Sequence, residues 1–366
     1  MTMFSNNKCE EILSKYGLNG NVLSCRAFGS GHINNTFLIN FLSNNGKNIK
    51  YVLQAVNSNV FKNIYEIMEN IRNVTDFIKN KSVKSKFLDF LQTDNGNTLY
   101  VDDSGVYWRV YRFIENSVTV DMPETDNDLY QCAYAFGKFQ RDLADFPAES
   151  LHEIIPDFHN TFKRYRAFLD AVEKDICGRS HKVEAEIDFI KSRSDFYGLL
   201  DEKYRSGILP LRVSHNDTKC NNVLLDCETR KAVCVIDLDT IMPGFSVNDF
   251  GDAVRFGTST AAEDETDLSK VHFDFDKFKI YARGFFDGCD GLLTDEEIML
   301  LPEGAKMMTA ECGMRFLTDY LEGDTYFKTE REEQNLDRCR TQLKLVSEME
   351  NNWDRMKACV SEFTGK

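Results

Sequence analysis

Three residues near the middle of the chain have the types and the spacing that phosphoryl transfer requires. Asp217 ends the tetrapeptide Ser-His-Asn-Asp, Asn222 follows five positions later, and Asp237 lies near the end of the next β-rich run. Such a reaction needs a carboxylate that accepts the proton of the attacking hydroxyl, and oxygen ligands for Mg²⁺. We therefore predict that Asp217 is the catalytic base and that Asn222 and Asp237 bind Mg²⁺.

A loop whose polar side chains only cap backbone groups is the alternative to this interpretation. It accounts for any one of the three residues, but it does not explain why a base and both metal ligands occur together. His215, two positions before Asp217, is predicted to organise the loop from a buried position rather than to carry a proton.

A further acidic residue competes for the metal-binding role. The triplet Asp-Phe-Gly at 249–251 matches the metal-binding triplet of protein kinases by letter, but it lies twelve residues beyond Asp237. The run 247–256 has the pattern of a helix that begins there, and carboxylates near a helix start commonly satisfy backbone N–H groups. Asp249 is therefore interpreted as a loop-bracing residue, and Asp237 remains the predicted metal ligand.

A glycine-rich loop near the N-terminus is the predicted nucleotide site. The loop at 29–35 connects two β-rich runs, as in kinases, whereas a dinucleotide-binding loop would lead from a strand into a helix. Glycines there allow backbone N–H groups to approach phosphate oxygens closely. An ordinary glycine turn is the alternative. The predicted ATP-binding residues are Gly29, Ser30, Gly31, Asn34, Gln54 and Glu69.

One of these residues departs from the pattern of protein kinases. Gln54 occupies the strand position at which a lysine would pair with a glutamate of the following helix, where Glu69 lies. Either other groups position the phosphates, or the protein has lost its activity. The intact base and metal ligands favour the first explanation.

The elements that must position these residues change character along the chain. Strand patterns occur at 22–28, 36–42, 51–56, 99–102 and 106–114, with one helix at 60–78. Helical patterns then predominate at 128–146, 161–174, 183–204, 275–286, 296–321 and 332–363, and a hairpin at 222–225 and 232–238 interrupts them. The predicted fold is α+β and protein kinase-like, with two lobes. Residues 1–114 form a small β-rich nucleotide-binding lobe, and residues 115–366 a larger helical lobe with the catalytic loop and the acceptor site.

The composition limits the partners of the protein. The chain has 366 residues, of which 42% are hydrophobic, and a formal net charge of −15. That charge offers no general attraction to nucleic acid or to an anionic membrane surface. Eleven scattered cysteines without a C-x-x-C pair indicate reduced thiols. With no signal peptide pattern and no long apolar run, we expect a cytoplasmic protein without an obligate protein partner.

Taken together, these motifs resemble the aminoglycoside phosphotransferase and choline kinase superfamily. Within it, the motif runs are similar to those of the N-acetylhexosamine 1-kinases; they are 214–226, 234–244, 249–257 and 259–265. The likeness extends from the loop near Gly29 to about Tyr326. The resemblance implies that ATP phosphorylates the anomeric hydroxyl of N-acetylglucosamine or N-acetylgalactosamine in a Mg²⁺-dependent reaction, with Asp217 as the base.

The resemblance also implies a set of acceptor contacts by matching position. Arg315 and Tyr326 can hydrogen-bond ring hydroxyls or an acetamido carbonyl, and Phe256 offers an apolar face. Without the resemblance, Phe256 is equally a core residue and Arg315 a surface ion-pair partner. The implied sugar-binding residues are His32, Leu238, Thr240, Phe256, Arg315 and Tyr326.

Two other functions stay open at this point. An aminoglycoside or amino-alcohol (choline-like) phosphotransferase would suit the charge of −15, and its cationic acceptor would need a cluster of carboxylates. The acidic block Glu263, Asp264, Glu265 and Asp267 could supply one, although it belongs to the motifs shared with the hexosamine kinases. The other function is a catalytically inactive nucleotide-binding scaffold. Retention of the base and both metal ligands counts against it.

Overall fold

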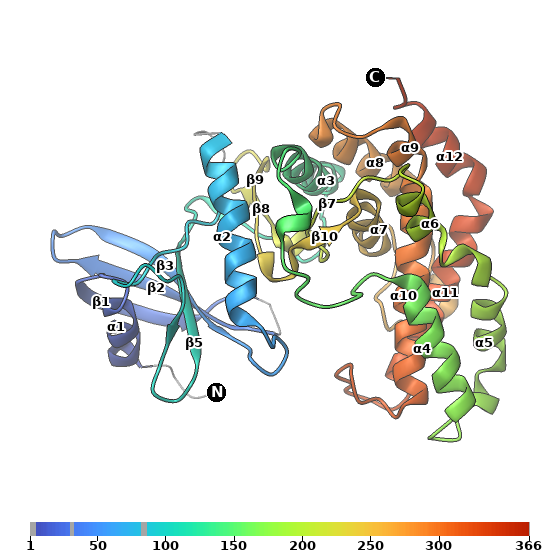
Figure 1. Ribbon diagram of the computed structural model, residues 1–366, viewed down its shortest axis with the longest axis horizontal. Coiled ribbons are helices and arrows are strands. Elements are labelled where there is room, and N and C mark those ends of the chain that lie inside the picture. The colour runs from blue at the N-terminus through green and yellow to red at the C-terminus, as the bar shows by residue number, and fades with distance from the viewer. Residues whose placement is uncertain (1–4, 30–32, 82–85, 366) are drawn as a thin grey trace. The chain divides into compact units, whose positions relative to one another are not determined.

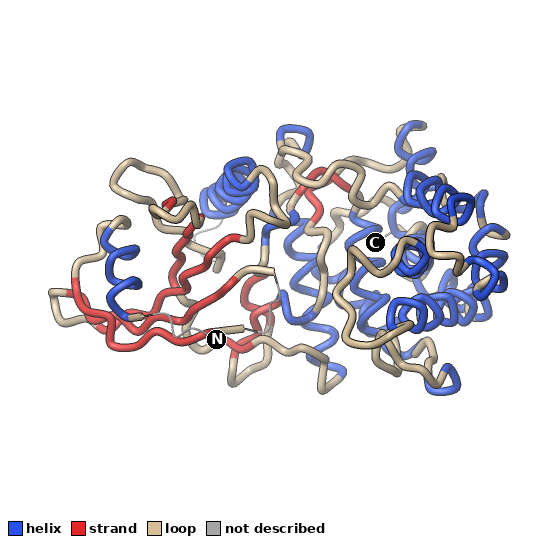
Figure 2. Tube along the Cα trace, turned by 90° about the horizontal axis from the view of Figure 1, so that it is seen from below, coloured by secondary structure: helices blue, strands red, loops and turns tan. Residues whose placement is uncertain are grey.

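Two units, one rich in strands and the other rich in helices, make up the chain. The computed structural model describes residues 5–29, 33–81 and 86–365. Contacts within the chain group Met1–Ser117 with Ile236–Ile241 as the first unit, and Val118–Val235 with Met242–Lys366 as the second. Strands lie mainly in the first unit and helices mainly in the second (Figures 1 and 2), which confirms the predicted α+β class. The division into domains at 114 and 115 stays a prediction.

An antiparallel sheet with the strand order β1-β2-β3-β5-β4 forms the centre of the first unit. The predicted strands at 22–28, 36–42 and 51–56 and the predicted hairpin at 99–114 are confirmed. The bounds are α1 Asn6–Ser14, β1 Gly20–Ala27, β2 Asn35–Ser43, β3 Asn48–Val56, α2 Ile64–Lys81, β4 Tyr100–Val101 and β5 Tyr107–Arg112, with β6 Ser117–Val118 at the boundary between the units.

Of the two helices of this unit, the sequence pattern predicts α2 but not α1. Helix α2 buries Ile67, Ile71 and Val74 on one face, in agreement with the apolar periodicity. The sequence pattern does not predict α1, whose nine residues contain few apolar positions. Its Ile12 and Leu13 are nevertheless fully buried in the core of the sheet. A helix this short depends on tertiary packing for its stability.

The second unit is mainly helical and contains two short antiparallel strand pairs, β7 with β10 and β8 with β9. The β8–β9 hairpin is the predicted one, but β9 ends at Val235, before Asp237 is reached. The bounds are α3 Asp126–Asp142, α4 Thr161–Lys174, α5 Glu184–Lys191, α6 Leu199–Arg205, β7 Arg212–Ser214, β8 Val223–Asp226, β9 Ala232–Val235, β10 Met242–Gly244, α7 Ser246–Gly257, α8 Phe275–Cys289, α9 Asp295–Met299, α10 Leu301–Leu321, α11 Gln334–Asn351 and α12 Trp353–Ser361.

Three helices that the periodicity predicts as continuous are each divided. The predicted helix at 183–204 becomes α5 and α6, that at 296–321 becomes α9 and α10, and that at 332–363 becomes α11 and α12. Pro302 stands in the first turn of α10, where its missing N–H costs nothing, and so begins a new helix. Asn352 ends α11 with φ −102°. Apolar spacing alone does not reveal such breaks, because buried positions continue on both sides.

A close approach of two helices fixes α7 against α10. A Cβ atom on Gly251 would lie 2.2 Å from the carbonyl oxygen of Gly304, and one on Gly304 would lie 2.1 Å from that of Val247. Only glycine permits this separation at either position. Phe250, beside this contact, is fully buried in the core of the second unit. This packing therefore fixes the position of α7 against α10. Asp249 lies in the first turn of α7, so its position is fixed as well.

Across the part of the chain that the structure describes, no helix is both long enough and apolar enough to cross a membrane. None of the eleven cysteines, all of which lie within the described residues, forms a disulfide bond.

Candidate active site

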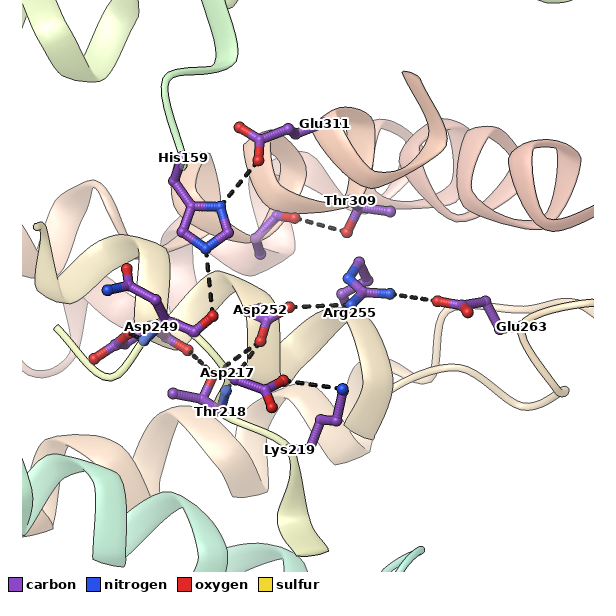
Figure 3. Close-up of polar contacts among 12 residues, drawn as sticks. His159, Asp217, Thr218, Lys219, Asp249, Asp252, Arg255, Glu263, Thr309 and Glu311 are labelled. Carbon is purple, nitrogen blue, oxygen red and sulfur yellow. Dashed lines mark hydrogen bonds and ion pairs between the residues drawn. The ribbon is translucent and has the colours of Figure 1, made fainter. Parts of the chain in front are cut away.

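The loop between β7 and β8 carries Asp217, and the first turn of α7 forms hydrogen bonds with this loop. The Asp249 carboxylate accepts hydrogen bonds from the backbone N–H groups of His215 and Asn216, at 2.8 Å each, and from the amide of Gln140 at 2.8 Å. The hydroxyl of Thr218 donates to the carbonyl of Asp249 at 2.6 Å (Figure 3). The interpretation of Asp249 as a loop-bracing residue is thereby confirmed.

Burial dominates the electrostatics of Asp249. Burial raises the pKa of this carboxyl, while the imidazole of His215 and the two backbone N–H groups act in the opposite direction. His215 is fully buried, and its ring makes edge-on contacts with Phe136 and Phe139 at 5.4 and 6.0 Å. Its Nδ1 accepts from the backbone N–H of Asp217 at 3.3 Å. The predicted role of His215 as a buried organiser of the loop is confirmed.

The Asp217 carboxylate has two polar neighbours. Nζ of Lys219 lies 3.0 Å from Oδ1, and the amide nitrogen of Asn222 donates to Oδ2 at 3.0 Å and to the backbone carbonyl of Asp217 at 2.8 Å. Burial by itself would lower the pKa of Lys219, but the charges of Asp217 and Asp252 raise it. The carboxylate is therefore fixed in orientation while its side chain keeps 30% exposure to solvent.

A chain of buried charges continues from this loop along α7. Asp252 accepts from the backbone N–H of Thr218 at 3.0 Å, and Arg255 pairs with Asp252 at 3.1 Å and with Glu263 at 2.8 Å (Figure 3). Burial alone would raise the pKa of Asp252, but the guanidinium of Arg255 brings it below the ordinary value. Removing one member of such a pair strongly destabilises a protein, because the other buried charge is left uncompensated. They stiffen the loop that presents Asp217.

His159 supports the same loop from the opposite side. Its Nε2 lies 3.5 Å from the backbone carbonyl of Asn216, and its Nδ1 lies 2.9 Å from Glu311 on α10 (Figure 3). Glu311 is fully buried and also accepts from the hydroxyl of Thr161 at 2.6 Å. The segment before α4 and the middle of α10 are thereby tied to the backbone next to Asp217.

The two predicted metal ligands belong to different units. In the second unit, Asn222 turns its amide nitrogen toward Asp217, which leaves its side-chain oxygen for a cation. In the first unit, Asp237 lies in the left-handed conformation, φ 60° and ψ 59°, directly before the short 3₁₀ turn Leu238–Thr240. Left-handed non-glycine residues are uncommon and often occur at functional sites. Amide and carboxylate oxygens are each a type of ligand that Mg²⁺ takes beside substrate phosphates.

A buried ion pair organises the first unit next to Asp237. Arg109 on β5 is 2% exposed and donates to both oxygens of Asp239, at 2.5 and 3.0 Å. Asn34 donates to the same carboxylate at 2.7 Å, and Gln54 accepts from Nε of Arg109 at 2.9 Å. Burial alone would lower the pKa of Arg109, but Asp239 raises it, with a smaller contribution from Asp237.

This network joins two predicted ATP-binding residues, Asn34 and Gln54, to the segment that carries Asp237. Gln54 also donates to the hydroxyl of Thr36 at 3.0 Å, so both ends of its amide are engaged. Arg109 thus places a positive charge in this part of the unit. It lies on β5, whereas Gln54, at the position where protein kinases have a lysine, lies on β3. The role of Gln54 toward ATP stays a prediction.

Of the other predicted nucleotide residues, Gly29 and Glu69 belong to the described residues, and Ser30 and Gly31 do not. Gly29 has φ +81°, with open space where a Cβ would be, and Glu69 is exposed on α2. Ser30, Gly31 and the predicted sugar contact His32 lie outside the described residues. Among the residues that are described, no group of three or more His, Cys, Asp or Glu side chains is arranged to hold a metal ion.

The remaining sugar contacts divide between the units. Leu238 is buried and Thr240 half-buried in the first unit. In the second, the ring of Phe256 is half-buried, not core, with Nζ of Lys219 5.4 Å from its centroid. Arg315 lies 5.9 Å from the ring of Tyr326, which is 72% exposed. The structure therefore brings together Lys219 with Phe256, and Arg315 with Tyr326, within one unit.

Several residues of these networks have no counterpart among the sequence predictions. Arg109 is a charged residue between the apolar residues Trp108 and Val110 of a predicted strand. Such a position could have indicated a buried, paired charge from the sequence. Lys219 stands two positions after the predicted base. Nothing in the sequence pairs His159 with Glu311, since 152 positions separate them.

Comparison with known proteins gives one family and several related folds. The family model described as "phosphotransferase enzyme family" matches residues 24–281. Among solved structures, an aminoglycoside phosphotransferase from Alicyclobacillus acidocaldarius is similar at a TM-score of 0.62 and 12% identity, covering 96% of this chain and 95% of its own.

Two further structures extend this likeness. A microcompartment-associated aminopropanol kinase has a TM-score of 0.61 and 13% identity, covering 96% of this chain and 99% of its own. A spectinomycin phosphotransferase in complex with ADP and spectinomycin has a TM-score of 0.58 and 14% identity, covering 95% and 99%. At such identities the likeness concerns the fold, and it confirms the predicted kinase-like bilobal fold.

Proposed function

Because the chain belongs to the phosphotransferase enzyme family, we propose that it is an ATP- and Mg²⁺-dependent kinase for the anomeric hydroxyl of an N-acetylhexosamine. The observation that carries the proposal is the presentation of Asp217. Its carboxylate is held by Lys219 and Asn222 on a loop that Asp249 braces through two backbone hydrogen bonds, and it remains partly open to solvent. A base presented in this way can meet an incoming hydroxyl without rearrangement.

In the proposed reaction, Asp217 accepts the proton of the anomeric hydroxyl. The oxygen forms a bond to the γ-phosphorus while the bond from that phosphorus to the β–γ bridging oxygen breaks, so that ADP leaves and the sugar 1-phosphate remains. Catalysis of this kind consists mainly of positioning and of electrostatic stabilisation. Lys219, 3.0 Å from Asp217, orients the carboxylate for the proton transfer.

The nucleotide and the metal ion complete the proposal. Two of the similar structures are complexes with ADP and two others are complexes with GDP, so a nucleotide co-substrate is expected here as well. We assign ATP binding to Gly29, Ser30, Gly31, Asn34, Gln54 and Glu69. Mg²⁺ bound by the side-chain oxygens of Asn222 and Asp237 would neutralise charge on the phosphates.

The acceptor is proposed to be a sugar rather than a cation because the acidic block is already occupied. Glu263 pairs with Arg255 at 2.8 Å, and Asp264 accepts from Gln334 at 2.8 Å. Glu265 lies 3.6 Å from Lys270 and Asp267 accepts from the backbone of Ser269 at 3.1 Å. An ammonium group of the acceptor would meet carboxylates that already have partners. The sugar contacts assigned are His32, Leu238, Thr240, Phe256, Arg315 and Tyr326.

An aminoglycoside or amino-alcohol acceptor remains the second candidate, since several proteins of similar fold are named as kinases or phosphotransferases for such acceptors. The deciding experiment incubates the protein with ATP, Mg²⁺ and a panel of N-acetylhexosamines, amino alcohols and aminoglycosides, and locates the new phosphate by ³¹P NMR. We expect phosphate on the anomeric oxygen of N-acetylglucosamine or N-acetylgalactosamine. Phosphate on an amino alcohol or an aminoglycoside, with none on the sugars, would refute the proposal.

Substitution of the base tests the mechanism separately from the substrate. Asp217→Asn should lower kcat on the order of 10²–10⁴-fold while ATP still binds with nearly unchanged affinity, measured by calorimetric titration. Asp103→Asn, at an exposed carboxylate of the first unit, is the control. Unchanged turnover in Asp217→Asn would mean that another group removes the proton. Wild-type protein that binds ATP but phosphorylates nothing would instead indicate an inactive scaffold.

A further inference from the structure

Two arginines of the second unit contact the same residue, Phe158, although the protein carries a net charge of −15. Arg164 on α4 donates from Nη2 to the backbone carbonyl of Phe158 at 3.1 Å. Arg315 on α10 faces the ring of the same Phe158, with 5.8 Å between the guanidinium carbon and the ring centroid. Burial lowers the pKa of Arg164, and the positive charge of Arg315 lowers it further. Both guanidinium groups therefore contact the same residue, Phe158.

No carboxylate of the described chain forms an ion pair with either guanidinium. Glu311, one helical turn before Arg315, is the nearest candidate, but its two oxygens are taken by His159 at 2.9 Å and Thr161 at 2.6 Å. In addition, Nε of Arg164 is buried and has no hydrogen-bond partner among the described residues. A buried donor without a partner is costly, and native proteins seldom retain one without a reason. An acceptor oxygen from a ligand would satisfy it.

The surroundings of Arg315 suit a flat polar ligand. Three aromatic rings lie around the guanidinium, those of Phe158, Tyr326 and Phe327, at 5.4 to 5.9 Å. Tyr326 is 72% exposed, yet its position is fixed, because the Asp319 carboxylate accepts from the backbone N–H groups of Tyr326 and Phe327 at 2.7 and 2.9 Å. An exposed aromatic side chain on a rigid loop offers contact area at a small entropic cost.

The pair is also linked to the catalytic loop within the same unit. The ring of Phe158 lies 4.4 Å from that of His159, and Nε2 of His159 lies 3.5 Å from the backbone carbonyl of Asn216, the residue before Asp217. Arg164 and Arg315 thus converge on Phe158, two contacts away from the proposed base. Figure 3 shows the second of these contacts, from His159 to the loop that carries Asp217.

We propose that Arg164, together with Arg315, is a specificity-determining residue that binds a carbonyl oxygen of the acceptor and excludes acceptors bearing an ammonium group. The inference rests on the proposed function: in an N-acetylhexosamine the oxygen is that of the acetamido group, and the excluded analogue is the free amino sugar. A guanidinium donates to a carbonyl in a fixed direction, whereas a protonated amine in the same position would face two like charges.

The test compares N-acetylglucosamine with glucosamine as acceptors for the wild-type protein, Arg164→Met and Arg164→Lys. Arg166→Met, at an exposed arginine on the same helix, is the matched control. We expect Arg164→Met to lower kcat/KM for N-acetylglucosamine about tenfold or more, mainly by raising KM, as befits the loss of one hydrogen bond from a charged donor. The ratio of kcat/KM for the two acceptors should fall in the same variant, Arg164→Lys should restore part of it, and Arg166→Met should retain it.

The outcomes separate this inference from the proposed function. If the wild-type protein phosphorylates N-acetylglucosamine and Arg164→Met keeps the wild-type ratio with an unchanged melting temperature, the inference is wrong and the function stands. If the wild-type protein phosphorylates amino alcohols and no sugar, both are wrong. Calorimetric titration of N-acetylglucosamine without nucleotide tests the site independently of turnover. Equal affinity in wild type and Arg164→Met would overturn the inference, and a loss confined to Arg164→Met would support it.

Discussion

Asp249 holds Asn216 in a backbone conformation that this residue would rarely adopt alone. The Asn216 N–H donates to the Asp249 carboxylate at 2.8 Å while Asn216 has φ +64°, in the left-handed region. Asparagine tolerates that region better than most residues. The next residue is Asp217, so the direction in which the proposed base leaves the loop is set by a hydrogen bond to a helix residue 33 positions further along the chain.

The roles of the two competing aspartates can be separated by substitution. Asp249→Ala should lower the free energy of unfolding by about 2–5 kcal/mol, because it leaves buried N–H donors unsatisfied. Asp237→Ala should abolish Mg²⁺-dependent turnover with a smaller loss of stability. Urea denaturation and a steady-state assay measure the two effects. Loss of Mg²⁺ dependence in Asp249→Ala, with Asp237→Ala still active, would mean that Asp249 binds the metal.

The contact between α7 and α10 predicts a strong penalty for one added methyl group. Gly251→Ala should destabilise the protein by about 1–3 kcal/mol or more, because the new Cβ would lie 2.2 Å from a backbone oxygen of Gly304 that cannot move freely. Gly198→Ala is the control, since that position has negative φ and open space around it. A melting temperature of Gly251→Ala equal to that of the control would contradict the close packing.

The buried ion pair Arg109–Asp239 should behave as a coupled unit in a double-mutant cycle. Either Arg109→Met or Asp239→Leu alone leaves a buried charge uncompensated and should cost about 3–5 kcal/mol. The double variant should cost clearly less than the sum, because both charges are then gone. The urea midpoints of the four proteins measure the coupling. Strict additivity would show that the two groups do not interact in solution.

The pair Asp128–Arg230 predicts a dependence of stability on pH. Arg230, in the turn between β8 and β9, donates to both oxygens of Asp128 at 2.9 Å and thereby lowers the pKa of this carboxyl from its ordinary 3.8. The folded state therefore binds this proton more weakly than the unfolded state. The stabilisation is fully present above the ordinary pKa and is lost as the pH falls through the lower folded value.

A pair of variants makes this dependence measurable. At about pH 6 the wild-type protein should exceed Asp128→Asn in free energy of unfolding by about 1–3 kcal/mol, and the difference should shrink toward pH 3. Asp103→Asn, at an exposed carboxylate for comparison, should show no such convergence. A wild-type advantage that stayed constant down to pH 3 would rule out a contribution from the ionised carboxylate.

The strand and helix patterns could be predicted wherever the element itself has a strong apolar signal. The runs 36–42 and 51–56 are short and rich in buried apolar residues, and the three- and four-residue spacing in α2 reflects the burial of one helix face, so the sequence carries the signal. The divisions at Pro302 and Asn352 were missed because burial continues across them. Helix α1 was missed because its stability derives from Ile12 and Leu13 packing against the sheet rather than from local propensity.

By itself, the sequence determined the candidate chemistry of this protein. Asp217, Asn222 and Asp237 lie close enough along the chain for residue type and spacing to suggest a base and metal ligands. The tertiary structure alone decided what holds them, through contacts such as Asp249 with Asn216, Arg109 with Asp239 and His159 with Glu311. Those partners are separated by 33, 130 and 152 positions. No local pattern encodes such pairs, because their proximity arises only when whole helices and strands pack.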